Sequence, residues 1–299
     1  MQMRQWPTLL LIVACSLSIM AIVTLSDHIP LWLSIAALAV LLVLHSSLQH
    51  EVLHGHPFRH AILNESLVFV PFGIFISYRR FRDTHLQHHI DEYITDPYED
   101  PESQYMDPAV WHRLPVALQL LLKVNGTLSG RLVLGPLVSL VFFYRADIRL
   151  LVQRNRDVIN AYQMHLAGLL IWCLFLFFYG ALPVWAYLLA CYMSLSLLGV
   201  RTYLEHQAHQ KVQGRTVIIE DRGLLAFLFL YNNFHLVHHV FPKAPWYRLP
   251  AMYKAQKDYF LLLNEGYCYP NYRSIIVRYF FRRKEPIAHP LSRVSKPAS

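Results

Sequence analysis

The stretch YNNFHLVHHVFPKAPWYRLP, residues 231–250, carries the strongest chemical signal in the chain: His235, His238 and His239. Residues at this spacing project from one face of an α-helix. Each neutral imidazole has ring nitrogens that need polar partners, so packing alone explains three of them on one face poorly. Metal ligation explains them well. The same spacing occurs a second time, at His85, His88 and His89.

The composition predicts an integral membrane protein. Of 299 residues, 55% are hydrophobic and only 15% are charged, whereas a soluble domain has about 25% charged residues. No Gly/Ser/Pro-rich linker divides the chain, so we expect a single domain over residues 1–299. The basic residues behind the net charge of +8 flank apolar runs and lie in the tail. They suit an anionic lipid surface and not a nucleic acid.

Four apolar runs are predicted to span the membrane, at residues 9–26, 31–48, 164–179 and 185–200. A helix of about 18 residues is roughly 27 Å long, close to the thickness of the hydrocarbon layer. Short connectors join the first run to the second and the third to the fourth. The sequence therefore predicts an all-α membrane protein whose spanning helices form two hairpins.

Three further apolar segments are predicted not to span. Residues 67–77 are too few and include Pro71 and Gly73, which favours a re-entrant or interfacial segment. Residues 114–124 and 132–144 contain or adjoin basic side chains, as in helices that lie in the membrane interface.

The distribution of arginine and lysine predicts the orientation. These residues concentrate at 78–82, 145–156, 201–222 and 273–284, and almost none lie in the two short turns. The positive-inside rule then places both termini and residues 80–160 and 201–299 in the cytoplasm. Every histidine cluster falls on that side, as a cytoplasmic cap able to hold two metal ions.

A third cluster, HEVLH at residues 50–54, follows the second predicted span. His50 and His54 are one helical turn apart, and the pattern also matches the HExxH motif of zinc proteases, with Glu51 as the base. A protease with one zinc ion would not use the two HxxHH clusters. An intramembrane zinc protease is therefore the weaker interpretation.

With one more histidine, which follows the fourth span, the chain offers nine candidate metal ligands. They are His50, His54, His85, His88, His89, His206, His235, His238 and His239. Nine imidazoles suit two ions, and nitrogen ligands favour iron, copper or zinc over magnesium or calcium. His209 competes with His206 for the single position, and the spacing does not choose among the three metals.

With these clusters, the chain resembles the membrane fatty acid desaturase superfamily, whose signature is the three boxes HxxxH, HxxHH and HxxHH. QHEVLHGHP (49–57), RDTHLQHHIDEYITDPYEDPES (82–103) and NNFHLVHHVFPKAPWYRLP (232–250) are similar to its bacterial members. The resemblance implies a non-haem di-iron centre on the cytoplasmic face of a bacterial inner membrane. Such a centre uses O₂ and two electrons to attack an unactivated C–H bond.

The resemblance also bears on the single histidine. Family members often supply one between the second and third boxes, and His206 in YLEH matches it best. Acyl-CoA desaturases have an asparagine one turn earlier that completes the metal shell, whereas Thr202 stands there in this chain. This difference leaves the second metal site the less certain part.

Metal-bound imidazoles usually donate their other N–H to a carboxylate or carbonyl group. We expect Asp91 or Asp96 to accept such a bond. Other candidates near the ligands are Glu51, Thr202, Glu205, His209, Asn232 and Asn233.

The leading prediction is a desaturase that inserts a double bond into a fatty acyl chain. No haem domain is fused to the chain, so we expect electrons from a separate ferredoxin- or cytochrome-type donor. The main alternative is a di-iron hydroxylase of a lipid, an alkane or a carotenoid. A histidine-rich metal transporter would need polar residues in the spans to make a path, and these spans offer almost none.

Overall fold

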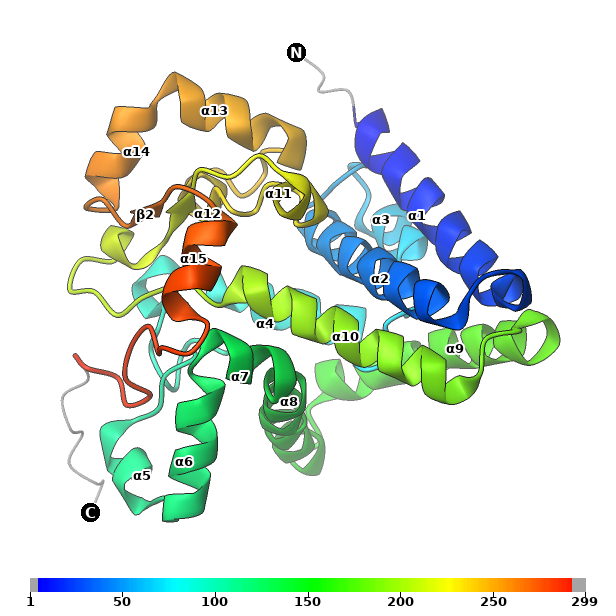
Figure 1. Cartoon of the computed structure of the whole chain (residues 1–299), viewed down its shortest axis with the longest axis horizontal. Coiled ribbons are helices and arrows are strands. Elements are labelled where there is room, and N and C mark those ends of the chain that lie inside the picture. Colours follow the sequence, from blue (N-terminus) through cyan, green and yellow to red (C-terminus); the bar gives the residue numbers. More distant parts are fainter. Residues whose placement is uncertain (1–4, 292–299) are drawn as a thin grey trace. The chain divides into compact units, whose positions relative to one another are not determined.

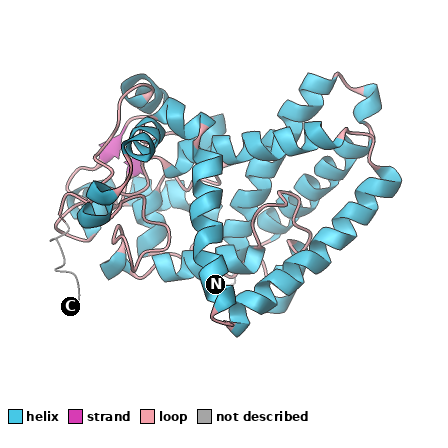
Figure 2. Ribbon diagram, turned by 90° about the horizontal axis from the view of Figure 1, so that it is seen from below, coloured by secondary structure: helices cyan, strands magenta, loops and turns pink. Residues whose placement is uncertain are grey.

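The computed structural model describes residues 5–291, and of Asp91 only the backbone. Nearly all of the regular structure is helical (Figure 2), which confirms the predicted all-α class. The chain divides into two compact units. Unit 1 holds the described residues up to Asp83 with Leu137–Leu198 and Leu228–Leu230, and unit 2 holds the remainder.

Unit 1 contains the long helices (Figure 1). Its elements are α1 (Trp6–Thr24), a 3₁₀ turn (Ser26–His28), α2 (Leu31–Leu53), α3 (Ala61–Leu67), the start of α4 (Tyr78–His88), most of α8 (Gly135–Val152), α9 (Arg156–Tyr179) and most of α10 (Val184–Thr202). In the described part of the chain, α1, α2, α9 and α10 are long and apolar enough to cross a membrane. The four predicted spans are confirmed.

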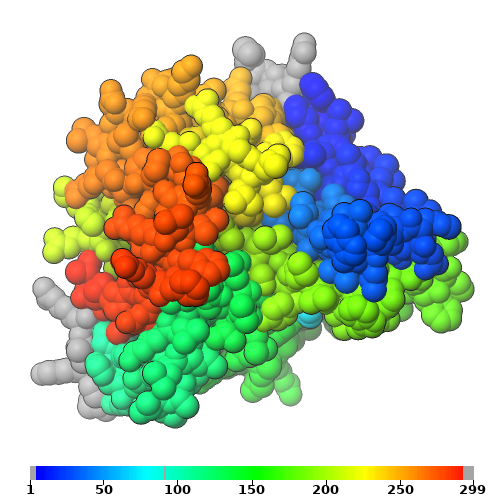
Figure 3. Space-filling view, viewed as in Figure 1, coloured from blue at the N-terminus to red at the C-terminus, as the bar shows by residue number. Residues whose placement is uncertain are grey.

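The two predicted hairpins are present, and their turns meet. The N–H of Ala181, between α9 and α10, donates to the carbonyl of Val23 near the end of α1 at 2.9 Å. The outer side of α1 (dark blue in Figure 3) stays uncovered, with Leu10 57% and Leu17 60% exposed. Large exposed apolar side chains along a span are typical of contact with lipid.

Two helices extend furthest beyond their apolar runs. The second continues to Leu53, which places His50 on α2. The third begins at Arg156, eight residues before the predicted start, because Asn155 caps it by accepting the backbone N–H groups of Asp157 and Val158 at 3.1 Å. A hydropathy pattern locates the apolar part of a helix, whereas a cap locates its beginning.

Between α3 and α4, residues 68–77 have no helix, and side chains from later helices bind their carbonyl groups. His165 Nε2 lies 2.9 Å from the carbonyl of Ile74, and the hydroxyl groups of Tyr144 and Tyr187 donate to Phe75 and Phe72. Irregular backbone in an apolar setting requires such partners. The segment predicted to be re-entrant or interfacial is thus irregular in structure.

Unit 2 contains short helices and one pair of two-residue strands. Its elements are the end of α4, two 3₁₀ turns (Asp91–Tyr93 and Gln213–Arg215), α5 (Pro108–Arg113), α6 (Val116–Asn125), α7 (Leu128–Val133), β1 (Ile218–Ile219), most of α11 (Leu224–Leu228), α12 (His235–Val240), a 3₁₀ turn (Trp246–Arg248), α13 (Leu249–Ala255), α14 (Lys257–Leu263), β2 (Cys268–Tyr269) and α15 (Tyr272–Tyr279). The strands β1 and β2 pair in parallel.

An apolar core surrounds α12 and fixes its position. Leu236 and Val237 pack with Phe234, Tyr253 and Phe260 in one buried cluster. A helix of six residues is too short to be stable alone. The packing of one side therefore holds the other side, which carries three buried histidines, in place.

Candidate metal centre

The second histidine box lies at the end of α4. His85 and His88 are in its last turns, and His89 follows directly, with its backbone N–H bonded to the carbonyl of His85 at 3.1 Å. The rings of His85 and His88 are buried. Because α4 continues for six residues past Arg82, its last arginine, it carries these rings to buried positions in unit 2.

Within unit 2, the predicted ligands form two groups. In the first, His89 Nε2 lies 3.0 Å from His85 Nε2 and 3.1 Å from His238 Nε2. The first group in this unit thus takes two histidines from the second box and one from the third.

The second group contains His88, His206, His235 and His239. His206 Nε2 lies 2.9 Å from His88 Nε2 and 3.0 Å from His235 Nε2. One ligand nitrogen from each of the four residues lies within 4.8 Å of all the others.

The first box belongs to unit 1. His50 is buried on the last turn of α2, and His54 is its C-cap residue. Their ring centroids are 4.9 Å apart, as expected for residues one turn apart. Glu51 is also buried, and its carboxylate lies 3.7 Å from Nε2 of His56.

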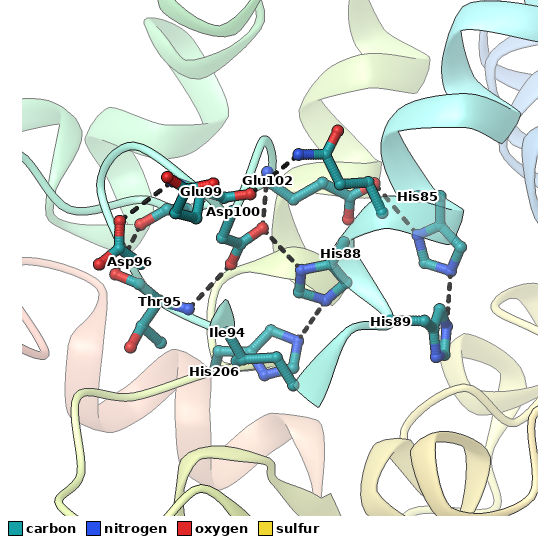
Figure 4. A network of polar contacts seen from close by, with 12 residues as sticks. His85, His88, His89, Ile94, Thr95, Asp96, Glu99, Asp100, Glu102 and His206 are labelled. Atoms are coloured by element: carbon teal, nitrogen blue, oxygen red, sulfur yellow. Dashed lines mark hydrogen bonds and ion pairs between the residues drawn. The ribbon is translucent and has the colours of Figure 1, made fainter. Parts of the chain in front are cut away.

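Carboxylates hold the rings of the second box (Figure 4). Asp100 Oδ1 lies 2.8 Å from His88 Nδ1, and Glu102 Oε1 lies 3.1 Å from His85 Nδ1. A carboxylate can only accept, so Nδ1 of each ring donates. In a neutral imidazole this leaves the lone pair on Nε2, the atom that faces the other histidines.

Asp96 was expected to accept the second N–H of a histidine ring, but Asp100 and Glu102 accept these bonds instead. Asp96 Oδ1 accepts the backbone N–H groups of Tyr98 and Glu99 at 2.8 and 3.0 Å (Figure 4), so it shapes the loop. The side chain of Asp91 lies outside the described residues. The sequence shows an acidic run after the second box, but its spacing does not reveal which carboxylate faces the rings.

A polar chain leads away from His235. Its Nδ1 lies 3.2 Å from Asn232 Oδ1, and Asn232 Nδ2 donates to Glu205 Oε1 at 2.9 Å. Glu205 forms an ion pair with Arg201 at 3.0 Å. All four side chains are buried, so the predicted residues Glu205 and Asn232 orient the ring of His235, and Arg201 compensates the charge of Glu205.

His206 and not His209 lies in the second group. Thr216 Oγ1 lies 3.3 Å from His206 Nδ1, and the Lys284 ammonium group donates to the His206 carbonyl. The ring of His209 lies instead 3.4 Å from the carboxylate of Glu265. The sequence contains no signal for the roles of Thr216 and Lys284, because both lie outside the boxes.

Two other predicted residues, Asn233 and Thr202, take part in hydrogen bonds with backbone carbonyl groups and not with histidine rings. Asn233 Nδ2 donates to the carbonyls of Ile219 and Asp221 at 2.6 and 2.9 Å, which ties the start of α12 to β1. The carbonyl of Thr202 accepts a hydrogen bond from Gln104.

Burial and crowding keep most of the second group neutral. Burial, together with the neighbouring imidazoles, lowers the pKa of His206, His235 and His239 well below the usual range. His88 differs: burial favours its neutral form, but the Glu102 and Asp100 carboxylates raise its pKa to about 9. Neutral imidazoles are the form that metal ligation requires.

The donor set fits a metal ion. Nδ1 of His88 and of His235 face acceptor oxygens, so Nε2 of each ring is the nitrogen that faces His206 and that would bind an ion in its deprotonated form. Two imidazoles bound at right angles, about 2.1 Å from an ion, have nitrogens about 3 Å apart. The Nε2 distances of 2.9–3.1 Å agree with this value.

These features define a class: helical membrane proteins with buried clusters of histidines that are able to bind metal. The family model for fatty acid desaturases matches residues 27–269, and the chain belongs to the fatty acid desaturase family. No curated protein is similar enough to count as a match. Membership makes the chain an oxidoreductase with a lipid substrate, in the setting of a membrane.

Proposed function

We propose that the chain is an O₂-dependent di-iron desaturase that introduces a double bond into a fatty acyl chain. The observation that carries this proposal is the pair of imidazole groups with Nε2 distances of 2.9–3.1 Å, in a member of the desaturase family. Carboxylates and a buried polar chain hold the rings of both groups from behind.

All nine histidines are proposed as iron ligands. Seven of them form the two groups of unit 2, and the box spacing and the family resemblance add His50 and His54. When bound, two iron ions would supply the activation of O₂ and the removal of hydrogen from an acyl methylene. The protein buries the rings of His85, His88, His235, His238 and His239, which limits the access of water to them.

The family resemblance supports a bacterial inner membrane as the location, with the boxes and both termini on the cytoplasmic side. A separate ferredoxin- or cytochrome-type protein would deliver the electrons. Hydroxylation is the second candidate, because Thr202 stands where acyl-CoA desaturases have an asparagine.

The test is expression in a host that lacks its own desaturase, followed by gas chromatography and mass spectrometry of the extracted lipids. Desaturation predicts products that have lost two hydrogens. Products that have gained one oxygen would establish hydroxylation instead, and unchanged lipids with iron bound would refute both.

Variants connect the products with the site. His239→Ala removes a ligand and should abolish the product, whereas His112→Ala, on the exposed face of α5, should leave it unchanged. A zinc protease would have the opposite dependence: it would need Glu51 and would tolerate His239→Ala.

A further inference from the structure

An open, shallow surface site of about 540 Å³ follows one face of α8, in unit 1. Its lining comes from this helix alone: Leu137, Leu140, Val141, Tyr144, Arg145, Ile148 and Arg149. These positions recur every three or four residues, so they form one continuous stripe on the helix.

Contacts on the opposite face fix the direction of this stripe. Asp147 is buried and binds Arg80 of α4 through both carboxylate oxygens, with N–O distances of 2.8–3.1 Å. Its Oδ2 also accepts the hydroxyl of Tyr162 at 2.7 Å. Residues two positions away lie about 200° around a helix, so Arg145 and Arg149 point away from the protein.

The stripe changes in character along its length. Its first half is apolar and open, with Leu137 58% and Val141 56% exposed. Its second half presents Arg145 and Arg149 one turn apart, and both are exposed. Within residues 5–291, no carboxylate pairs with either guanidinium group.

A membrane phospholipid has the complementary chemistry. The stripe from Leu137 to Arg149 is about 18 Å long at 1.5 Å per residue, with its apolar residues at one end and its two arginines towards the other. The acyl chain of the lipid would lie on the apolar half of the stripe. The lipid phosphate would reach the two guanidinium groups, which bind phosphate oxygens well.

We propose that this face of α8 binds one anionic phospholipid of the membrane. The inference does not depend on the iron ligands or on the reaction. It assigns a lipid contact to α8 that differs from the one at the active site, since none of the lining residues is a box residue.

The experiment uses the full-length protein in dodecylmaltoside, titrated with dioleoylphosphatidylglycerol and analysed by native mass spectrometry. Each basic side chain close to an anionic lipid raises the affinity for that lipid about fivefold. Arg145→Gln/Arg149→Gln should therefore weaken binding about 30-fold. Lys243→Gln/Lys254→Gln removes two exposed positive charges from unit 2 and should leave the affinity unchanged.

A second lipid and a second variant separate the outcomes. The wild type should bind dioleoylphosphatidylcholine more weakly than the anionic lipid. The arginine variant should bind both lipids with the same low affinity. Leu137→Ser/Val141→Ser should weaken both lipids. Equal retention of the anionic lipid by the wild type and the arginine variant would overturn the proposal, as would a second copy of the chain bound on this face.

Discussion

Nδ1 of His88 and Oδ1 of Asp100 lie 2.8 Å apart, and both side chains are buried. Asp100 also accepts the backbone N–H of Thr95 through its other oxygen at 2.9 Å, so one carboxylate holds both the ring and the loop behind it. Loss of such a partner typically weakens metal binding about 10- to 100-fold.

We therefore expect Asp100→Asn to lower iron affinity by about one to two orders of magnitude. Asparagine keeps the size of the side chain and an acceptor for Thr95, but removes the charge that holds the His88 N–H. Metal content measured by plasma mass spectrometry after dialysis against a graded chelator checks this expectation. Asp96→Asn is the matched control, and an equal loss in both variants would mean that the loop matters and the His88 contact does not.

The positions of His206 and His209 give a second prediction. His206→Ala should remove about half of the bound metal, because one of the two groups loses a ligand. His209→Ala should bind as much metal as the wild type, since its ring lies beside Glu265. The same metal analysis measures both variants. A loss of metal in His209→Ala and not in His206→Ala would assign the ligand between the second and third boxes to His209.

The ion pair between Arg80 and Asp147 gives a third prediction, on stability. Both side chains are buried, so Asp147→Ala leaves an uncompensated charge and should destabilise unit 1 by about 3–5 kcal/mol. The midpoint of thermal unfolding in detergent should fall accordingly. Lys257→Gln breaks the exposed pair with Glu220 and should not shift the midpoint. Equal midpoints for Asp147→Ala and the wild type would show that the pair is not maintained in solution.

Close packing at Gly168 of α9 gives a fourth prediction. A Cβ atom there would lie 2.8 Å from the carbonyl oxygen of Phe69 and 2.9 Å from Cδ of Pro71. Gly168→Ala should thus cost about 1–3 kcal/mol through overcrowding. Gly73, in the same irregular segment, has no atom within 4 Å of such a Cβ, so Gly73→Ala should be tolerated. Thermal unfolding of both variants compares them directly, and an equal effect would argue against this packing.

The sequence predicts the spans because an apolar run is a local property. The clustering of histidine rings within each box is predictable for the same reason, because a separation of three or four residues brings side chains together on a helix. The start of α9 was harder, because one asparagine, Asn155, decides it. Hydropathy does not detect such a cap.

Contacts between distant residues could not be predicted in this way. Asp100 and Asp96 are both acidic and close in sequence, yet one binds the ring of His88 and the other closes a turn. Thr216 and Lys284 reach His206 from positions 10 and 78 residues away. Which residue arrives there is a matter of tertiary packing, which no local pattern encodes.

The irregular segment at residues 68–77 also constrains the order in which the protein is built. Its carbonyl partners Tyr144, His165 and Tyr187 follow Phe75, Ile74 and Phe72 by 69, 91 and 115 residues. A chain synthesised from its N-terminus exposes these carbonyls long before their partners leave the ribosome. The carbonyls of Phe72, Ile74 and Phe75 can therefore all find these partners only after Tyr187, near the start of α10, has been made.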